Sequence, residues 1–492
     1  MTFASFAFVA FFVIVLLALA ACRSRVQRQL VILLASVYFY AYWNPRYLFL
    51  LATPSVIDYW CAQRIARAED DRRRKLWLIA SLVSNLGLLA YFKYATFLLQ
   101  NLAWIGGRTV APLDIVLPVG ISFYTFKTMS YTIDVYRRQI EPCRSWWQYA
   151  LYVTYFPELV AGPIVRASMF LPQMTRALTF SGPRTYAGLQ QVALGFSKKL
   201  LVADRLATFV TPVFAMPAIY SAATVRSAVI AYALQIYCDF SGYSDIAIGV
   251  STIIGFDLPE NFNMPYAATS ISEFWRRWHM TLSQWLRDYL YIPLGGSRCG
   301  RVRTYLNLTI TMLLGGLWHG ASWTFVAWGG LHGLSLVVHK IWRDAAPRRG
   351  WELPSWLAWA MTVTYVCFAW VLFRAPTFQV AGIVAGKVLG LDPVGVRYVN
   401  LPLTLILPVV VIAHFVGRAA NRSVQSAGSR PAWAARFYPE PARFAIRPHP
   451  QAGAYARWPA TGFALGLLTT TWALVFYLFA AVDSSPFIYF QF

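Results

Sequence analysis

The chain has few charged residues for its length. Charged side chains make up 13% of its 492 residues, and hydrophobic residues make up 58%. A typical soluble domain contains about 25% charged residues, so this chain cannot cover a water-facing surface. That excludes a soluble globular protein, a disordered chain and a soluble nucleic-acid-binding protein. Because the apolar runs are each about 20 residues long rather than short and alternating, the sequence predicts an all-α, polytopic membrane protein.

The sequence also lacks the spacings that mark metal sites and several common catalytic motifs. None of its six cysteines forms a CxxC pair. No nucleophile elbow, phosphate loop, zinc spacing or dinucleotide fingerprint is present. We therefore expect no metal site and no disulfide framework, with the cysteines serving as small core residues.

Acidic residues are scarce as well, since 20 acidic side chains stand against 43 basic ones and the net charge is +23. Such an excess is typical of the positive-inside rule and of attraction to anionic membrane lipid. No basic residue precedes the first apolar stretch, whereas Arg23, Arg25 and Arg28 follow it. A signal peptide carries its charge in front, so residues 3–22 are predicted to be a retained membrane helix.

The apolar segments predict one membrane domain over residues 1–492 with about 11 to 13 membrane helices. A hairpin turning at Asn44-Pro45 is expected within residues 29–63, and residues 418–460 are expected to form a basic cytoplasmic linker. The other predicted membrane segments are residues 76–97, 113–133, 185–215, 223–256, two helices within 306–340, then 355–373, 399–417 and a last helix at 461–482.

Two stretches do not fit simple spans. Residues 147–163 contain Pro157 and Gly162, and a helix broken at membrane depth must be covered by protein or line a cavity. We expect a re-entrant or broken helix there. Residues 273–290 place tryptophan, leucine and phenylalanine on one helical face and arginine and polar residues on the other. This pattern predicts one interfacial amphipathic helix.

Ionisable residues within apolar sequence are functional candidates because charge at the bilayer centre costs at least about 2.5–3.5 kcal/mol. His319 lies in strongly apolar sequence and is flanked by Gly315, Gly316 and Gly320, which allow close approach of a helix or a substrate. An imidazole there can act as a general base near neutral pH. Alternatively, it is a structural histidine bonded to a neighbouring helix.

The remaining polar candidates are less distinctive. His279 lies at the edge of the apolar face of 273–290, where it either points into a pocket or is an ordinary interfacial histidine. His332 falls on a different helical face from His319, which favours a supporting or structural role. Asp239 and Asp245 either orient a histidine or arginine, or close a structural ion pair, and the second interpretation is favoured. His339 reads as a helix-end residue at the interface, and His414 and His449 have no supporting context.

Long motifs in this sequence resemble those of the membrane-bound O-acyltransferase family. They are FWRRWHMTLSQWLRDYLYIPLGG, which contains His279, and RTYLNLTITMLLGGLWHGASWTFVAWGGLHG, which contains His319. The stretches LPVGISFYTFKTMSYTIDVYR, YFPELVAGPIVRASMFLPQ and QIYCDFSGYSDIAIG are similar to the same family. The closest likeness is to the bacterial branch that contains the alginate O-acetyltransferase membrane subunit. The likeness spans roughly residues 30–375 and leaves 418–460 unmatched.

The resemblance implies a ring of helices, with re-entrant and interfacial segments, around a central tunnel in the bacterial inner membrane. It implies that His319 is the invariant histidine and that His279 is a second polar residue facing the same tunnel. Acetyl-CoA would be the cytosolic acyl donor and a surface polysaccharide the acceptor outside, with periplasmic SGNH-type or related acetyltransferases as partners. Direct transfer and an acetyl-histidine intermediate both remain open.

Alternatives to this interpretation concern the acceptor and the activity. The acceptor could be alginate, peptidoglycan, cellulose or another surface glycan, or the reaction could be D-alanyl transfer to teichoic acid. The sequence YIPLGGSRCGRVRTYLN between the two histidines resembles the polysaccharide branch more than the D-alanyl branch. A transporter would also need buried polar residues and broken helices, but no paired halves are detectable.

Overall fold

The computed structural model describes residues 1–176, 181–346, 349–398 and 401–427. Within these residues the regular structure is helical, apart from one isolated β-bridge between Tyr220 and Val396. The prediction of an all-α protein is therefore confirmed. The predicted last helix at 461–482 and most of the predicted linker at 418–460 lie outside the described residues. The first ten residues of that linker are not a linker but continue helix α19, Leu401–Ala427.

The described chain forms two compact units. Unit 1 comprises residues 1–192 and 246–259, and unit 2 comprises residues 193–245 and the described residues from 260 onward. The single membrane domain expected from the sequence stays a prediction.

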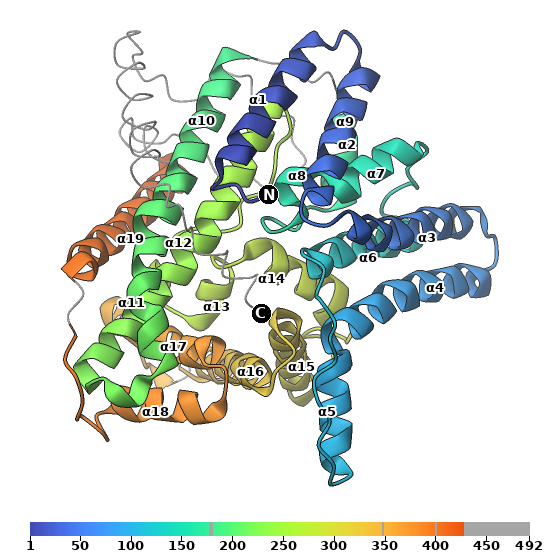
Figure 1. Ribbon diagram of the computed structural model, residues 1–492. Helices are drawn as coiled ribbons and strands as arrows, with labels where there is room; N and C mark the ends of the chain where they lie inside the picture. The colour runs from blue at the N-terminus through green and yellow to red at the C-terminus, as the bar shows by residue number, and fades with distance from the viewer. Residues whose placement is uncertain (177–180, 347–348, 399–400, 428–492) are drawn as a thin grey trace, which may run out of the picture. The chain divides into compact units, whose positions relative to one another are not determined.

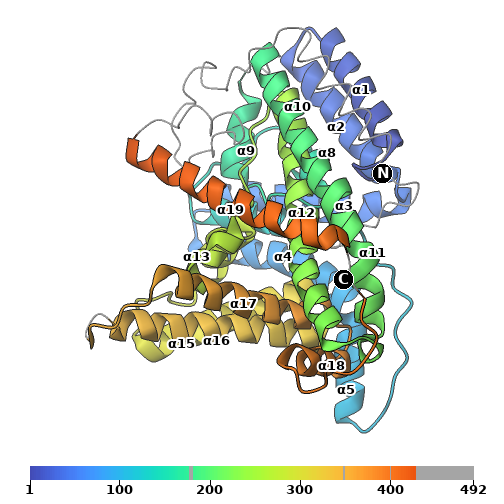
Figure 2. The same ribbon diagram turned by 90° about the vertical axis from the view of Figure 1, so that its left-hand side faces the viewer.

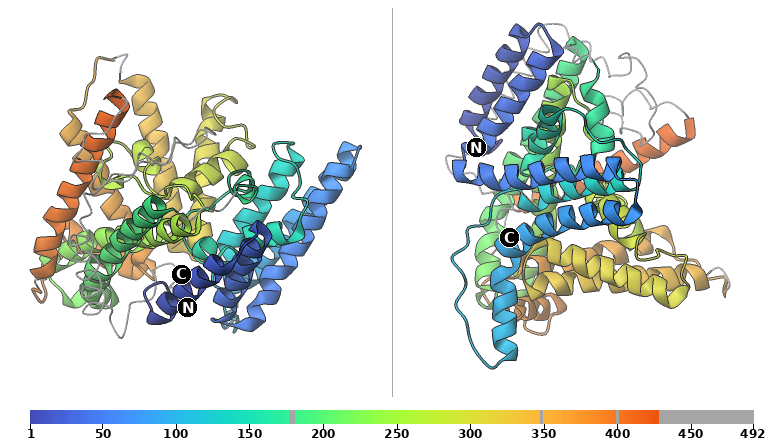
Figure 3. Two further views of the ribbon diagram at one scale, coloured as in Figure 1. Left: turned by 90° about the horizontal axis from the view of Figure 1, so that it is seen from above. Right: turned by 90° about the vertical axis from the view of Figure 1, so that its right-hand side faces the viewer.

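Unit 1 begins with a helical hairpin in which α1 and α2 lie side by side (Figure 3). Ser5 caps the first helix, and Ser24 with Gln27 forms a capping box on the second. The predicted helix at 3–22 and the predicted turn at Asn44-Pro45 are both confirmed. The elements of this unit are α1 Phe6–Ala21, α2 Arg25–Ala41, η1 Pro45–Tyr47, α3 Leu48–Arg67, α4 Asp71–Leu89, η2 Ala90–Tyr94, α5 Ala95–Ile105, α6 Ile121–Tyr136, α7 Trp146–Thr154, α8 Phe156–Leu159, α9 Ala167–Met174, most of α10 Gly182–Phe196 and the end of α12 Ala222–Ile254 from residue 246.

Three helices of unit 1, α3, α4 and α6, lie side by side (Figure 1) and share a buried polar network. Asp58 accepts hydrogen bonds from Ser81 Oγ at 2.6 Å and from Asn85 Nδ2 at 2.7 Å. Thr128 Oγ1 donates to Asn85 Oδ1 at 2.7 Å. Polar contacts between apolar helices fix their register, because an unsatisfied polar group in hydrocarbon is costly.

The broken segment predicted at 147–163 is present in unit 1. Helix α7 ends at Thr154, the four-residue helix α8 follows, and irregular backbone continues to Arg166. Its central acid, Glu158, is fully buried and forms an ion pair with the buried Lys127 of α6. Lys127 Nζ also donates to the Tyr152 carbonyl at 2.7 Å. One buried cation therefore binds both a backbone carbonyl and one carboxylate oxygen of the broken segment.

Unit 2 contains a layer in which α15, α16 and α17 lie side by side (Figure 2). Its core is apolar and rich in tryptophan, with Trp278, Trp328 and Trp370 among its largest fully buried side chains. The elements of this unit are η3 Ser197–Ala203, α11 Asp204–Ala215, η4 Pro217–Ile219, α12 Ala222–Ile254 up to residue 245, η5 Pro265–Ala267, α13 Ile271–Trp275, α14 Met280–Leu286, η6 Arg287–Tyr291, α15 Arg301–His319, α16 Trp323–Ala345, α17 Ser355–Arg374, α18 Phe378–Leu389 and α19.

Two of the described helical segments are long and apolar enough to cross a membrane, Asp71–Ile105 and Ser355–Arg374. Several other long helices carry buried polar or ionisable side chains, such as Asp58 in α3 and Asp239 in α12, which lowers their hydropathy. The larger number of spans expected from the sequence stays a prediction.

Candidate active site

His319 is the last residue of α15 and is 4% exposed. Residues 320–322 turn the chain into α16, whose first turn is capped by Ser322. The two helices approach backbone to backbone, because a Cβ on Gly316 would lie 2.3 Å from the Phe325 carbonyl oxygen. Gly316, three residues before the histidine, thus serves helix packing, and that packing fixes where the imidazole lies.

The imidazole of His319 lies among aromatic rings from three helices. Its ring centroid is 5.0 Å from that of Trp318, 5.1 Å from Trp328 and 5.2 Å from Phe373. The Trp328 ring is perpendicular to it. Such surroundings exclude bulk water and leave the imidazole in a low-dielectric site, where electrostatic and proton-transfer effects are strong.

His279 lies at a break between α13 and α14 and is fully buried. Its backbone is left-handed, with φ 41°. This conformation costs a non-glycine residue about 1–3 kcal/mol and clusters at functional sites. Its imidazole packs edge-on against the Phe240 ring, with the two ring centroids 4.7 Å apart. The Nδ1 atom lies 3.1 Å from Asn261 Oδ1.

The structure brings both predicted site residues to one indole. The ring centroid of Trp318 lies 6.1 Å from that of His279 and 5.0 Å from that of His319. Two buried bases that share an aromatic neighbour form a compact site, and the imidazole of His279 also lies against the side-chain amide of Asn261. Which of them acts on a substrate stays a prediction.

The expectation of one continuous amphipathic helix over 273–290 is wrong. The helix stops at Trp275, restarts at Met280 and becomes a π-helix at 287–291. Residues 261–263 pair with the backbone at the break, since Asn263 N donates to Arg277 O and Met280 N to Asn261 O, both at 2.9 Å. This long-range pairing overrides the helical periodicity, and it buries His279 instead of leaving it on a helix edge.

Of the other histidines, His332 shares the aromatic neighbour Trp328 with His319. His332 is buried beside Trp328, and its Nδ1 accepts a hydrogen bond from Trp275 Nε1 at 3.3 Å, which is consistent with the predicted supporting role. His339 is partly exposed within α16, short of the helix end where it was expected. His414 is buried in α19, and His449 lies outside the described residues.

The two acids of α12 close ion pairs, as the favoured interpretation predicted. Lys199 Nζ lies 2.6 Å from Asp239 and 2.9 Å from Asp204, and Lys198 Nζ lies 2.5 Å from Asp245. Sequence reasoning missed both lysines. Their only signal was two adjacent cations within the long apolar stretch at 185–215.

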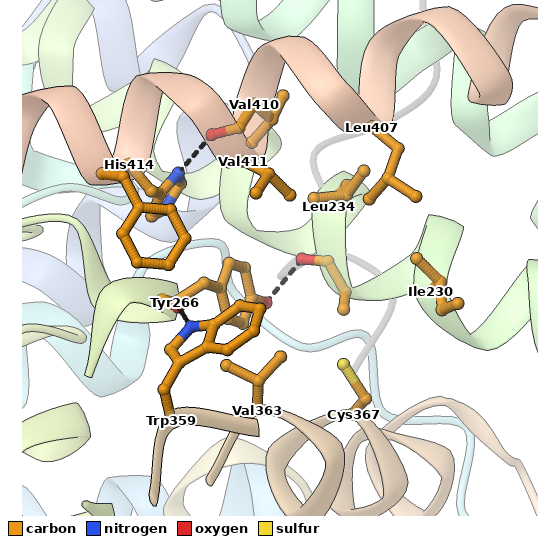
Figure 4. Close-up of a pocket in the computed structure, with 12 residues that line it drawn as sticks. Ile230, Leu234, Tyr266, Trp359, Val363, Cys367, Leu407, Val410, Val411 and His414 are labelled. Atoms are coloured by element: carbon orange, nitrogen blue, oxygen red, sulfur yellow. Dashed lines mark hydrogen bonds between the residues drawn. The ribbon is translucent and has the colours of Figure 1, made fainter. Parts of the chain in front are cut away.

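A separate apolar cavity of about 70 Å³ lies between α12, α17 and α19 (Figure 4). Its lining includes Leu234, Trp359, Leu407 and His414, whose Nδ1 lies 2.8 Å from the Val410 carbonyl oxygen. Neither His279 nor His319 lines it, so it is distinct from the candidate active site. The described residues hold no cluster of three or more metal-ligating side chains.

Residues 143–376, which include both histidines, match the membrane-bound O-acyltransferase family. Taken with the close relatives below, this match shows that the chain belongs to that family and is a membrane-bound O-acyltransferase. It is 38% identical to the probable alginate O-acetylase of Pseudomonas aeruginosa over the whole of both chains. It is 43% identical to that of Azotobacter vinelandii over 77% of this chain and 76% of the relative. It is also 38% identical to the peptidoglycan O-acetyltransferase of Helicobacter pylori over 76% of each chain.

Proposed function

We propose that this protein takes acetyl groups from cytosolic acetyl-CoA and passes them across the bacterial inner membrane toward a surface polysaccharide. In this proposal a ring of about 11 to 13 membrane helices surrounds a tunnel in which donor and acceptor meet. The whole of residues 1–492 would act as one membrane domain. A periplasmic SGNH-type or related acetyltransferase would receive the acetyl group or complete its transfer to the glycan.

His319 is the proposed general base. Its imidazole takes the proton of an acceptor hydroxyl, the hydroxyl oxygen forms a bond to the thioester carbonyl carbon, and the carbon–sulfur bond breaks. The imidazolium then returns the proton to the departing CoA thiolate, so the protein is unchanged. Proton transfer of this kind contributes about 10²–10⁴-fold in rate. In the alternative route an imidazole nitrogen attacks the thioester carbon, the carbon–sulfur bond breaks with release of CoA thiolate, and the acetyl group then passes from the imidazole to the hydroxyl oxygen.

His279 is the proposed partner of His319, polarising or positioning the reacting group. One observation carries this pairing: both imidazoles are buried and both contact the indole of Trp318. Holding donor and acceptor together in a site without bulk water contributes more than either imidazole alone, because it removes the entropic cost of bringing the reactants together.

The decisive experiment is thioester cleavage by the purified, detergent-solubilised protein with acetyl-labelled acetyl-CoA. The wild type should release free CoA thiol, and His319→Ala should lose most of that activity. His339→Ala is the matched control, since that histidine is partly exposed and lies outside the site. Equal thiol release by His319→Ala and the wild type would overturn the role of His319. Movement of an acceptor across the membrane without thioester cleavage would instead favour a transporter.

Peptidoglycan is the second candidate acceptor, because the Helicobacter pylori relative is a peptidoglycan O-acetyltransferase. The matches to alginate O-acetylases favour an exopolysaccharide. Ester-linked acetate should be measured separately in the exopolysaccharide and in the peptidoglycan of a deletion strain. The fraction that loses acetate, and regains it with the wild-type gene but not with His319→Ala, identifies the acceptor.

A further inference from the structure

The side chain of Asn261 lies at the break that carries His279. It belongs to an irregular segment before α13 and is 1% exposed. Its Oδ1 lies 3.1 Å from His279 Nδ1, 2.9 Å from Thr281 Oγ1 and 3.4 Å from the backbone nitrogen of Thr281. One amide oxygen therefore contacts one nitrogen of His279 and two groups of Thr281.

These contacts decide which nitrogen of His279 carries its proton. The backbone N–H of Thr281 can only donate, so the amide atom facing it must be the oxygen rather than the nitrogen. The opposite end of the amide agrees, because Nδ2 lies 3.4 Å from Ser244 Oγ and can donate to it. An amide oxygen has no proton to give. His279 Nδ1 must therefore be the donor in its contact with Asn261.

We propose that Asn261 is a positioning residue that holds His279 as the Nδ1-protonated tautomer. The lone pair of the neutral imidazole is then on Nε2, the nitrogen that can accept a proton or a hydrogen bond from the reacting group. This inference rests on the proposed function, in which His279 takes part in acyl transfer. It adds to that function the atom of His279 that acts and the residue that selects it.

The choice of a neutral amide has a physical reason. The rings that contact His279, among them Phe240 and Trp318, are uncharged, so the site favours the neutral imidazole. A carboxylate at position 261 would also accept from Nδ1, but its charge would favour the imidazolium, which has no lone pair to offer. The amide therefore fixes the tautomer without promoting protonation.

The test compares Asn261→Ala and Asn261→Asp with the wild type in the thiol-release assay. Asn261→Ala removes the oxygen that accepts the hydrogen bond from His279 Nδ1. We therefore expect kcat to fall by as much as a positioned base contributes, about 10²–10⁴-fold, and KM to change less. Asn261→Asp keeps an acceptor but adds charge, so the acidic limb of the pH–rate profile should move to higher pH. Asn307→Ala is the matched control, because Asn307 is an equally buried asparagine of the same unit, bonded to the Gly296 carbonyl.

A double-mutant cycle with His279→Ala separates positioning from general stabilisation. If Asn261 acts through His279, Asn261→Ala should cause no further loss of activity in the His279→Ala background. Additive losses, or an Asn261→Asp profile that coincides with the wild type, would overturn the inference. If Asn261→Ala does not fold, the pH profile of Asn261→Asp decides alone. Wild-type activity in His279→Ala would instead refute the role of His279 in the proposed function.

Discussion

Two regions of this protein bury ionisable side chains, and they do so in different ways. In unit 1, Lys127 and Glu158 are both buried, and their ion pair joins α6 to the broken segment. In unit 2, His279 and His319 are also buried, and tryptophan and phenylalanine rings pack against both. In the first region two opposite charges compensate each other. In the second region aromatic rings surround imidazoles, which can be neutral.

This difference shows why burial of an ionisable residue is a weak sign of function by itself. A buried ion pair satisfies its own charges and is costly to break, so it holds structure. A buried imidazole in a ring of aromatic side chains keeps the capacity to gain or lose a proton, which is what catalysis uses. The pairing of Asp239 and Asp245 with Lys198 and Lys199 belongs to the first kind, although both acids lie in the family-matched region.

The largest expected effect is on activity, at His319. Both His319→Ala and His319→Gln should lower thiol release from acetyl-CoA by about 10²–10⁴-fold, because glutamine can form hydrogen bonds but cannot take up a proton at neutral pH. The thermal midpoint in detergent should change little. Retention of activity by His319→Gln would show that His319 contributes only a hydrogen bond. The claim that buried imidazoles act in catalysis whereas buried ion pairs act in structure would then be wrong.

Removal of one ion-pair partner in unit 1 should act on stability instead. We expect Lys127→Met to lower the free energy of unfolding by about 3–5 kcal/mol, because it leaves Glu158 buried with no cation. Lys127→Met combined with Glu158→Gln should recover part of this loss. The measurement is the thermal midpoint and the yield of folded protein. Turnover per folded molecule should fall far less than in His319→Ala, and an equal fall would remove the distinction between the two regions.

A smaller effect is expected at the glycine that packs α15 against α16. In Gly316→Ala the new Cβ would lie 2.3 Å from a backbone oxygen of α16, so the helices must separate at a cost of about 1–3 kcal/mol. His319 lies one turn away and should shift, which lowers activity. Gly330→Ala is the control, because its Cβ would lie 3.4 Å from the end of the Leu313 side chain. Equal thermal midpoints for the two variants would show that the close packing is dispensable.

The sequence was sufficient for features that depend on local pattern. Apolar runs and turn residues located α1, the hairpin at Asn44-Pro45, the break after Thr154 and the pair α15 and α16. His319 could be singled out because a histidine between glycines in apolar sequence is unusual. Each of these signals lies within about one helix length of the residue it explains.

Features that depend on contacts distant in sequence could not be predicted. The periodicity of 273–290 gave no warning that residues 261–263 would pair with the backbone and force His279 into a left-handed conformation. Asn261 lies within the family-like span, but no local pattern marked its role, which comes from three contacts with residues 18 to 20 positions later. Lys198 and Lys199 were likewise missed because two of their carboxylate partners, Asp245 and Asp239, lie on α12.

The smallest expected effect concerns an acid near the candidate site that is only partly buried. Burial raises the pKa of Glu273, but hydrogen bonds from Thr269 and Arg277 outweigh it and hold the pKa below its usual value. Such a carboxylate contributes stability above the unfolded pKa of about 4.3, and that contribution is lost as the pH falls through the lower, folded pKa. Glu273→Gln should therefore lower the thermal midpoint slightly at neutral pH, and the gap from the wild type should narrow in acid. The exposed Glu352 provides the control in Glu352→Gln. A gap that widens in acid would contradict this sign and would show that the hydrogen bonds do not favour the ionised form.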